Sequence, residues 1–278
     1  MIDYHIHPDY SPDAQGSIQE YAQRALELGL SEICFTTHYD CDPAREEDDQ
    51  VRVKGELVSV HSDWLRPYFE DVEAARLSYP QLAIAAGLEV GYSPEVEEHI
   101  GQILRSYPFD FVMGSIHLFD HLALTVEEES RLIFAGKSAG QVVQRYFKLV
   151  EEAVKSGLFD VIGHLDIYRR YGLSFYGDEI LGVHQGLVEE LFTEMGQKGI
   201  GLEINTAGWR HGQGEPYPSF ALLKEARARG VTHLTIGSDA HRIGDLGYAV
   251  EKAAQLAKAA GYDAHCTFHC RSPHSLLL

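Results

Sequence analysis

Positive charge is scarce in this chain. Lys and Arg together number 23 against 42 Asp and Glu, which gives a formal net charge of −19. A protein whose main partner is a nucleic acid needs clustered Lys and Arg to contact the phosphates, so the composition argues against that class of protein. The excess of carboxylates is compatible with divalent cations and with a cationic small molecule as partners.

Long apolar runs are absent as well. No stretch approaches the roughly 18 consecutive apolar residues that a membrane span requires. The segment after Met1 has neither the basic region nor the apolar run of a secretory leader. The sequence therefore predicts a cytoplasmic protein without a membrane partner.

Cysteine is rare, and its spacing does not suggest a disulfide framework. The four residues, Cys34, Cys41, Cys266 and Cys270, contain no CxxC pair, so we expect reduced thiols. Packing of strands explains Cys266 and Cys270 better than metal binding does. The acidic run 46–49 is expected to be a solvated loop, with attraction of a cationic substrate as the alternative.

The hydrophobic pattern alternates between strand and helix from end to end. Strands are expected at residues 2–5, 32–36, 82–89, 111–116, 161–163, 201–204 and 233–236. Helices are expected at 18–28, 61–77, 95–106, 139–156, 184–198, 219–229 and 246–260, followed by a short strand at 265–269. No linker interrupts the 278 residues. The pattern predicts one α/β domain over residues 1–278, a closed or nearly closed TIM-like barrel of seven β/α units.

Potential metal ligands recur where these strands give way to loops. Six imidazoles and three carboxylates are too many for one metal ion and suit a cluster of two or three. In barrels of this kind the site lies at the carboxyl ends of the strands, whereas a random scatter would place several of these residues on helices. The nine candidates are His5, His7, Asp13, His38, Glu89, His117, His164, Asp239 and His241.

The local spacing of these residues supports a shared site. His5 and His7 are two apart, so both rings point to the same face of a strand. Asp13 follows a proline-bounded loop that can turn back across the strand end. Asp239 and His241 repeat the two-residue spacing after the last expected barrel strand.

Glu89 ends an apolar strand, where a purely structural role would leave a buried carboxylate without a partner. The alternative for any one candidate is a hydrogen-bonded residue at a strand end. For the whole set, that alternative requires the same coincidence on every strand. His121, four residues after His117, is a further candidate for the pocket wall.

The segments that carry these candidate ligands resemble the motifs of the polymerase and histidinol phosphatase (PHP) superfamily. The opening segment DYHIHPDYSPD at 3–13 is similar to the first motif of that superfamily. TH at 37–38, GLE at 87–89, GSIH at 114–117, GH at 163–164 and GSDAH at 237–241 resemble the remaining motifs, in order. Segments 164–171 and 203–210 resemble the histidinol-phosphatase branch.

The resemblance implies a distorted seven-stranded β/α barrel that holds three divalent metal ions. The ligand chemistry suits zinc, manganese or iron and does not choose among them. Carried over by position, His5, His7, Glu89 and Asp239 hold one ion, Glu89 bridges to a second held by His117 and His164, and Asp13, His38 and His241 hold the third.

The implied activity is hydrolysis of a small-molecule phosphate monoester, L-histidinol phosphate, in histidine biosynthesis. We expect a hydroxide between two of the ions to attack phosphorus directly, because metals supply the acceleration that a lone general base cannot. The expected catalytic residues are Asp13, Glu89, Asp239 and His241, and the proton donor is left open between Asp13, His241 and a metal-bound water.

Arginines are expected to clamp the phosphate, because a guanidinium contacts phosphate oxygens in pairs. Arg169 and Arg210 are the first candidates. A second pair of candidates is Arg170 and Arg242. No other arginine is singled out.

Two alternatives to the named activity remain. One is a PHP phosphoesterase that acts on a nucleotide, a phosphodiester or phosphotyrosine. The other is a non-catalytic, metal-stabilised scaffold, which the presence of all nine ligands disfavours.

Overall fold

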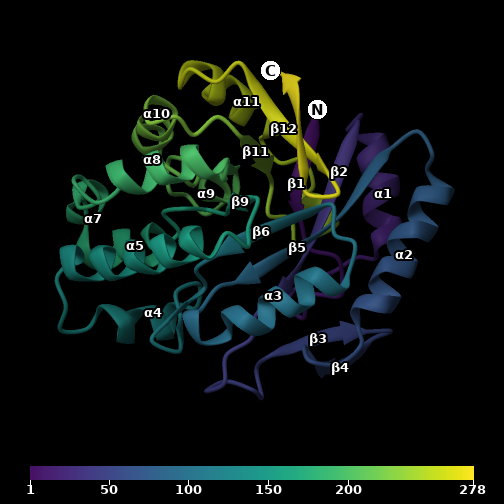
Figure 1. Cartoon of the computed structure of the whole chain (residues 1–278), viewed down its shortest axis with the longest axis horizontal. Coiled ribbons are helices and arrows are strands. Elements are labelled where there is room, and N and C mark those ends of the chain that lie inside the picture. Colours follow the sequence, from purple (N-terminus) through teal and green to yellow (C-terminus); the bar gives the residue numbers. More distant parts are fainter.

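A computed structural model describes residues 1–278 and shows seven parallel strands at its centre (Figure 1). Neighbouring strands in the sheet follow one another along the chain, so the order of the strands in space is their order in the sequence. This arrangement confirms the predicted barrel architecture. The strands are β1 (Ile2–Ile6), β2 (Glu32–Tyr39), β5 (Ala83–Gly91), β6 (Phe111–Ser115), β9 (Val161–Ile162), β10 (Gly201–Asn205) and β11 (Leu234–Gly237).

The barrel nearly closes where β11 returns to β1. A parallel bridge joins Ile6 to Ala240: the amide of His7 donates to the Ala240 carbonyl at 2.9 Å, and the Ala240 amide donates to the His5 carbonyl at 3.2 Å. The buried carboxylate of Asp3 reinforces this seam by accepting the Ser238 amide and the Gly247 amide, each at 2.8 Å. These contacts place the tip of β11 beside β1.

Seven helices of nine or more residues lie over the barrel where the periodicity predicts them. Capping boxes begin two of them: Ser17 with Glu20, and Ser138 with Gln141. A core of 69 buried residues packs mainly between these helices and the strands. The helices are α1 (Ile18–Glu27), α2 (Leu65–Ser78), α3 (Glu97–Ser106), α5 (Ala139–Ser156), α8 (Glu189–Lys198), α10 (Phe220–Ala228) and α11 (Val250–Ala259).

The prediction missed short elements in the loops after β2, β6 and β9, and three helices begin four or five residues later than expected because turns precede them. Helix α2 starts at Leu65 instead of 61, α8 at Glu189 instead of 184, and α11 at Val250 instead of 246. Two hairpins, β3 (Gln50–Val53) with β4 (Glu56–Ser59) and β7 (Leu118–Phe119) with β8 (Leu122–Ala123), lie in these loops. The same loops contain the helices α4 (Glu127–Phe134), α6 (Arg169–Tyr176) and α7 (Glu179–Gly182). Helix α9 (Ala207–Arg210) follows β10, the turn η1 (Pro94–Val96) precedes α3, and the turn η2 (Ile243–Asp245) precedes α11.

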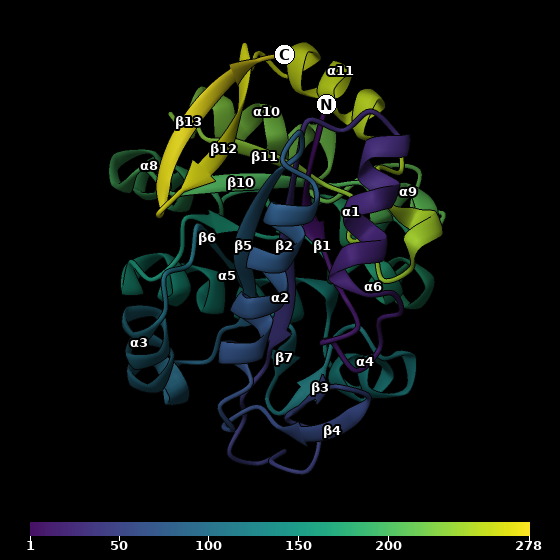
Figure 2. The same cartoon turned by 90° about the vertical axis from the view of Figure 1, so that its right-hand side faces the viewer.

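The two ends of the barrel differ. Figure 2 shows β3, β4 and β7 at the end opposite to the one where both chain termini lie. At the end with the termini, the hairpin β12 (Ala264–His269) and β13 (Ser272–Leu277) covers the barrel. Cys266 and Phe268 pack there against Tyr4 and Phe111, which confirms the predicted terminal strand. The barrel interior is therefore plugged at one end and lined by long loops at the other.

No helix in the structure combines the length and the apolar character needed to cross a membrane. All four cysteines are free thiols, and only Cys270 is exposed.

Replacing Asp3 with Ala is expected to lower the free energy of unfolding by about 3 kcal/mol, because it leaves buried amide donors at the barrel seam without an acceptor. Urea unfolding followed by circular dichroism measures this change. The control is Glu27→Ala, which removes an exposed ion pair with Arg24 and should change the value by less than about 0.5 kcal/mol. Equal losses in the two variants would contradict the role given to Asp3.

Candidate metal centre

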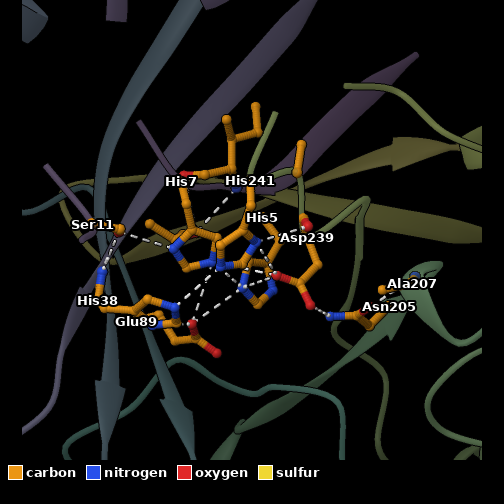
Figure 3. Close-up of polar contacts among 12 residues, drawn as sticks. His5, His7, Ser11, His38, Glu89, Asn205, Ala207, Asp239 and His241 are labelled. Atoms are coloured by element: carbon orange, nitrogen blue, oxygen red, sulfur yellow. Dashed lines mark hydrogen bonds and ion pairs between the residues drawn. The ribbon is translucent and has the colours of Figure 1, made fainter. Parts of the chain in front are cut away.

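The structure brings all nine predicted ligands together at the open end of the barrel. They come from β1, β2 and β5, from the residues that follow β6, β9 and β11, and from the segment after β1. Figure 3 shows the side chains of His5, His7, His38, Glu89, Asp239 and His241 meeting at one place. Strand tips that lie far apart in the sequence therefore supply one cluster.

Glu89 lies at the centre of this cluster and is 1% exposed. Its Oε1 atom lies 2.8 Å from His164 Nε2 and 3.2 Å from His117 Nε2. Its Oε2 atom faces the other way, 3.0 Å from His38 Nδ1, 3.3 Å from His5 Nε2 and 3.4 Å from His7 Nε2. One oxygen of this carboxylate thus faces two imidazoles, and the other faces three.

The three groups of ligands implied by the PHP resemblance are also three groups in space. Asp239 Oδ1 lies 3.6 Å from His5 Nε2 and 3.4 Å from His7 Nε2, on the Oε2 side of Glu89. On the solvent side, His241 Nε2 lies 3.3 Å from Asp13 Oδ2 and 3.3 Å from His38 Nε2. Three sets of N and O atoms share Glu89 or border on it.

The geometry of His5 and His7 fits a cation. Their Nε2 atoms are 2.9 Å apart. His5 Nδ1 lies 2.6 Å from Glu203 Oε1, and His7 Nδ1 lies 3.2 Å from Ser11 Oγ, so the protons of neutral rings belong on the Nδ1 atoms. Two bare lone pairs then face each other, an arrangement that a positive ion between them stabilises. Glu89 Oε2, whose nearest polar neighbour is His38 Nδ1 at 3.0 Å, points to the same place.

The carboxylates and imidazoles of the cluster stabilise each other's charged forms. Burial opposes ionisation of Glu89, but the imidazoles of His5 and His117 outweigh it and hold the pKa of this carboxyl well below its ordinary value. Burial likewise opposes protonation of His5, yet Glu203, Glu89 and Asp239 hold its pKa well above the usual range. Ionised carboxylates and positive charge are therefore interdependent here.

A layer of carboxylates behind the ligands orients their imidazole rings. These carboxylates were not among the predicted site residues. Glu203 accepts from His5 Nδ1 and, through Oε2, from the His164 amide at 2.8 Å. Asp40 Oδ1 lies 2.8 Å from His117 Nδ1. A carboxylate that holds the far nitrogen of a ligating histidine fixes its tautomer and raises its basicity. Gly237 leaves the space, because a Cβ there would collide with His5 and Glu203.

The turn that carries Asp239 is held in an unusual backbone conformation. Asp239 has φ of 55°, a left-handed value that non-glycine residues rarely adopt. Arg210 donates to the carbonyls of Ser238 and Asp239, each at 2.8 Å, and its guanidinium lies over the ring of Tyr248. Arg210 therefore positions the turn, which differs from the phosphate clamp predicted for it.

The predicted role of Arg169 also disagrees with its placement. Arg169 is 2% exposed, its Nε lies 2.7 Å from Asp166 Oδ2, and another nitrogen donates to the Pro216 carbonyl. With its guanidinium committed inside the protein, it does not reach the cleft. Its neighbour Arg170, one of the two second candidates, lines the cleft instead. Arg242, the other, is exposed and lies outside the lining.

The cluster forms the floor of a cleft of about 360 Å³, a volume that suits a small ligand. Its walls come from the segment after β2, with Arg45, Asp48 and Asp49, and from the segment after β6. Asp49 is buried, so the acidic run 46–49 is not a uniformly solvated loop as expected. His121 does not line the cleft, and its ring lies 2.8 Å from Asp42.

The chain is similar in sequence and in structure to known proteins. The sequence model of the PHP domain matches residues 3–207. A probable histidinol-phosphatase of Deinococcus radiodurans is 33% identical, with 94% of each chain covered. A crystal structure of histidinol phosphate phosphatase from Lactococcus lactis, complexed with zinc, L-histidinol and phosphate, is 25% identical, covers 98% of each chain and superposes with a TM-score of 0.81.

Replacing Glu203 with Gln should weaken metal binding about 10–100-fold, because the amide cannot hold His5 as a charged acceptor does. Metal retained after dialysis against graded chelator concentrations measures the change. Glu151→Gln, an exposed substitution on α5, is the matched control and should bind metal as the unmodified protein does. Unchanged retention in Glu203→Gln would remove this residue from the support of the centre.

Proposed function

The chain belongs to the PHP domain family, and from that premise we propose that it hydrolyses L-histidinol phosphate to L-histidinol and phosphate in histidine biosynthesis. We further propose that residues 1–278 act as one catalytic domain. The observation that carries the proposal is the set of nine N and O ligands gathered around the buried Glu89. The zinc, L-histidinol and phosphate bound by the Lactococcus lactis relative support the choice of substrate.

We propose three metal positions. His5, His7, Glu89 and Asp239 would hold one ion, and Glu89, His117 and His164 a second. Asp13, His38 and His241 would hold the third. Bound ions of this kind activate a water molecule as the nucleophile and neutralise charge on the phosphoryl oxygens. Zinc, manganese and iron all suit the ligands.

The chain's own residues orient the ester and handle its protons. Arg170 is the arginine of the cleft whose guanidinium has no carboxylate partner, since Arg45 is paired with Glu129 and Asp48. Arg170 is therefore available to grip two phosphoryl oxygens. Asp13 and His241 lie at the solvent side of the cluster, where the departing alkoxide leaves and takes up a proton.

An acidic wall would recognise the positive end of the substrate. L-Histidinol phosphate carries an amine and an imidazole besides its phosphate. Asp48 and Asp49 line the cleft, and Asp48 also pairs there with Arg45 at 3.1 Å. Burial raises the pKa of Asp49 to about 6, so its carboxyl is mostly ionised at neutral pH. A cationic amine is attracted to this wall, whereas a neutral leaving group gains nothing from it.

Replacing Arg170 with Ala should lower kcat/KM by tenfold or more with little change in stability, because a phosphate contact is lost and no buried pair is broken. Arg169→Ala is the matched comparison. It leaves the buried carboxylate of Asp166 without its ion-pair partner and should reduce the free energy of unfolding by about 3 kcal/mol. Steady-state kinetics and urea unfolding on both variants separate the two roles. An Arg170→Ala enzyme with unchanged kcat/KM would contradict the assignment.

Replacing Asp48 with Asn should raise KM for L-histidinol phosphate about threefold to tenfold, because the amine loses a facing charge in partly screened surroundings. The same variant should hydrolyse p-nitrophenyl phosphate, which has no amine, with its KM unchanged. Glu46→Gln, on the same segment but outside the cleft, is the control. A parallel rise of KM for both substrates would show that Asp48 does not read the amine.

The substrate itself is tested by phosphate release from L-histidinol phosphate, AMP, phosphotyrosine and p-nitrophenyl phosphate. We expect kcat/KM for L-histidinol phosphate to exceed the others by about a hundredfold, which corresponds to roughly 2.7 kcal/mol of added binding in the transition state. A flat profile would keep the phosphoesterase assignment and reject the substrate. No hydrolysis of any ester by metal-loaded protein would reject both.

A further inference from the structure

A second group of metal-ligating side chains comes together on the outer side of β2. Cys41, His61 and His99 offer one sulfur and two ring nitrogens that all lie within 4.8 Å of one another. None of the three residues lines the cleft around Glu89. The group is therefore separate from the centre described above.

The alternation of side chains along the strand explains the separation. His38 and Asp40 point into the cleft, so Tyr39 and Cys41 point the other way, into the core beneath the helices. The hydroxyl of Tyr39 lies 2.8 Å from His99 Nε2 and orients that ring. Cys41 therefore faces helix α3, on which His99 lies.

The thiol of Cys41 has no other partner. The residue is 6% exposed, and no hydrogen bond uses its sulfur, whereas the sulfurs of Cys34 and Cys270 each contact a polar atom. The rings of His61 and His99 meet edge to face, with centroids 5.0 Å apart.

We propose that Cys41, His61 and His99 bind a zinc ion. One thiolate and two imidazoles form the mixed S and N ligand set that zinc takes in proteins, and the metal displaces the Cys41 proton to solvent. His61 is exposed, so the fourth position faces solvent and can hold water. The active centre, in contrast, offers only nitrogen and oxygen.

The position of the three residues gives the ion a mechanical role. Cys41 precedes the β3–β4 hairpin and His61 follows it, so one ion joins both ends of that segment to α3. The same segment carries Asp48 and Asp49 to the cleft. Binding of zinc at this site fastens the acidic wall to the body of the barrel.

Titration of metal-free protein with Co²⁺ tests the site. A cobalt ion bound by thiolate shows a sulfur-to-metal charge-transfer band in the near ultraviolet, and none of the nine ligands around Glu89 is a cysteine. We expect this band in the unmodified protein and its bleaching by added Zn²⁺. Cys41→Ser should abolish the band and bind about one fewer Co²⁺ per chain, while the control Cys270→Ser should retain it.

His61→Gln provides a second variant at an exposed position, where folding is not at risk. It should weaken the cobalt affinity reported by the band at least about tenfold, and the matched control His274→Gln, also exposed, should leave it unchanged. Absence of the band from the unmodified protein would overturn the proposal. Persistence of the band in folded Cys41→Ser, judged by circular dichroism, would overturn it as well.

Discussion

A carboxylate buried among imidazoles requires positive charge between them, and the open end of this barrel is arranged around that requirement. Glu89 is nearly inaccessible to solvent, and five rings approach its two oxygens. Isolated in a core, such a carboxylate would cost several kcal/mol. Together with Asp239 and the surrounding imidazoles it instead forms a set of donors that divalent ions satisfy.

Support for this cluster comes from buried and partly buried residues behind the ligands. Glu203 holds both the ring of His5 and the amide of His164, so it ties β10 to two ligands on other strands. Asp3 fixes the seam next to the turn of Asp239, and Arg210 holds the carbonyls of that turn. The precision of the ligands is thus a property of the closed barrel and not of any single strand.

Much of this arrangement follows from the sequence, because its signals are local. Buried parallel strands are apolar runs, and a candidate ligand at or just after the end of six of the seven runs is visible without any structure. His5 and His7 share a face through their spacing alone, and their ring nitrogens do meet. Helix α5 has the predicted bounds because its capping box and its left-handed C-cap, Gly157, are encoded at its own ends.

What the sequence did not reveal depends on contacts between distant segments. Arg169 and Arg170 are adjacent and chemically identical, and only the packing of Asp166 and Pro216 decides which one is buried. Glu203 and Asp40 look like ordinary acidic residues until the barrel places them behind histidines. Strand β3 (QVRV) alternates polar and apolar residues but is only four residues long, and β4 (ELVS) does not alternate, so both read as loop.

The most direct measurement is anomalous diffraction from crystals of the metal-loaded protein, collected at the absorption edge of the metal. The account predicts three peaks around Glu89: one among His5, His7, Glu89 and Asp239, one beside His117 and His164, and one beside Asp13, His38 and His241. Two of these ions should contact opposite oxygens of Glu89. A map with no ion bound to Glu89, or with a single ion in the cluster, would contradict the account.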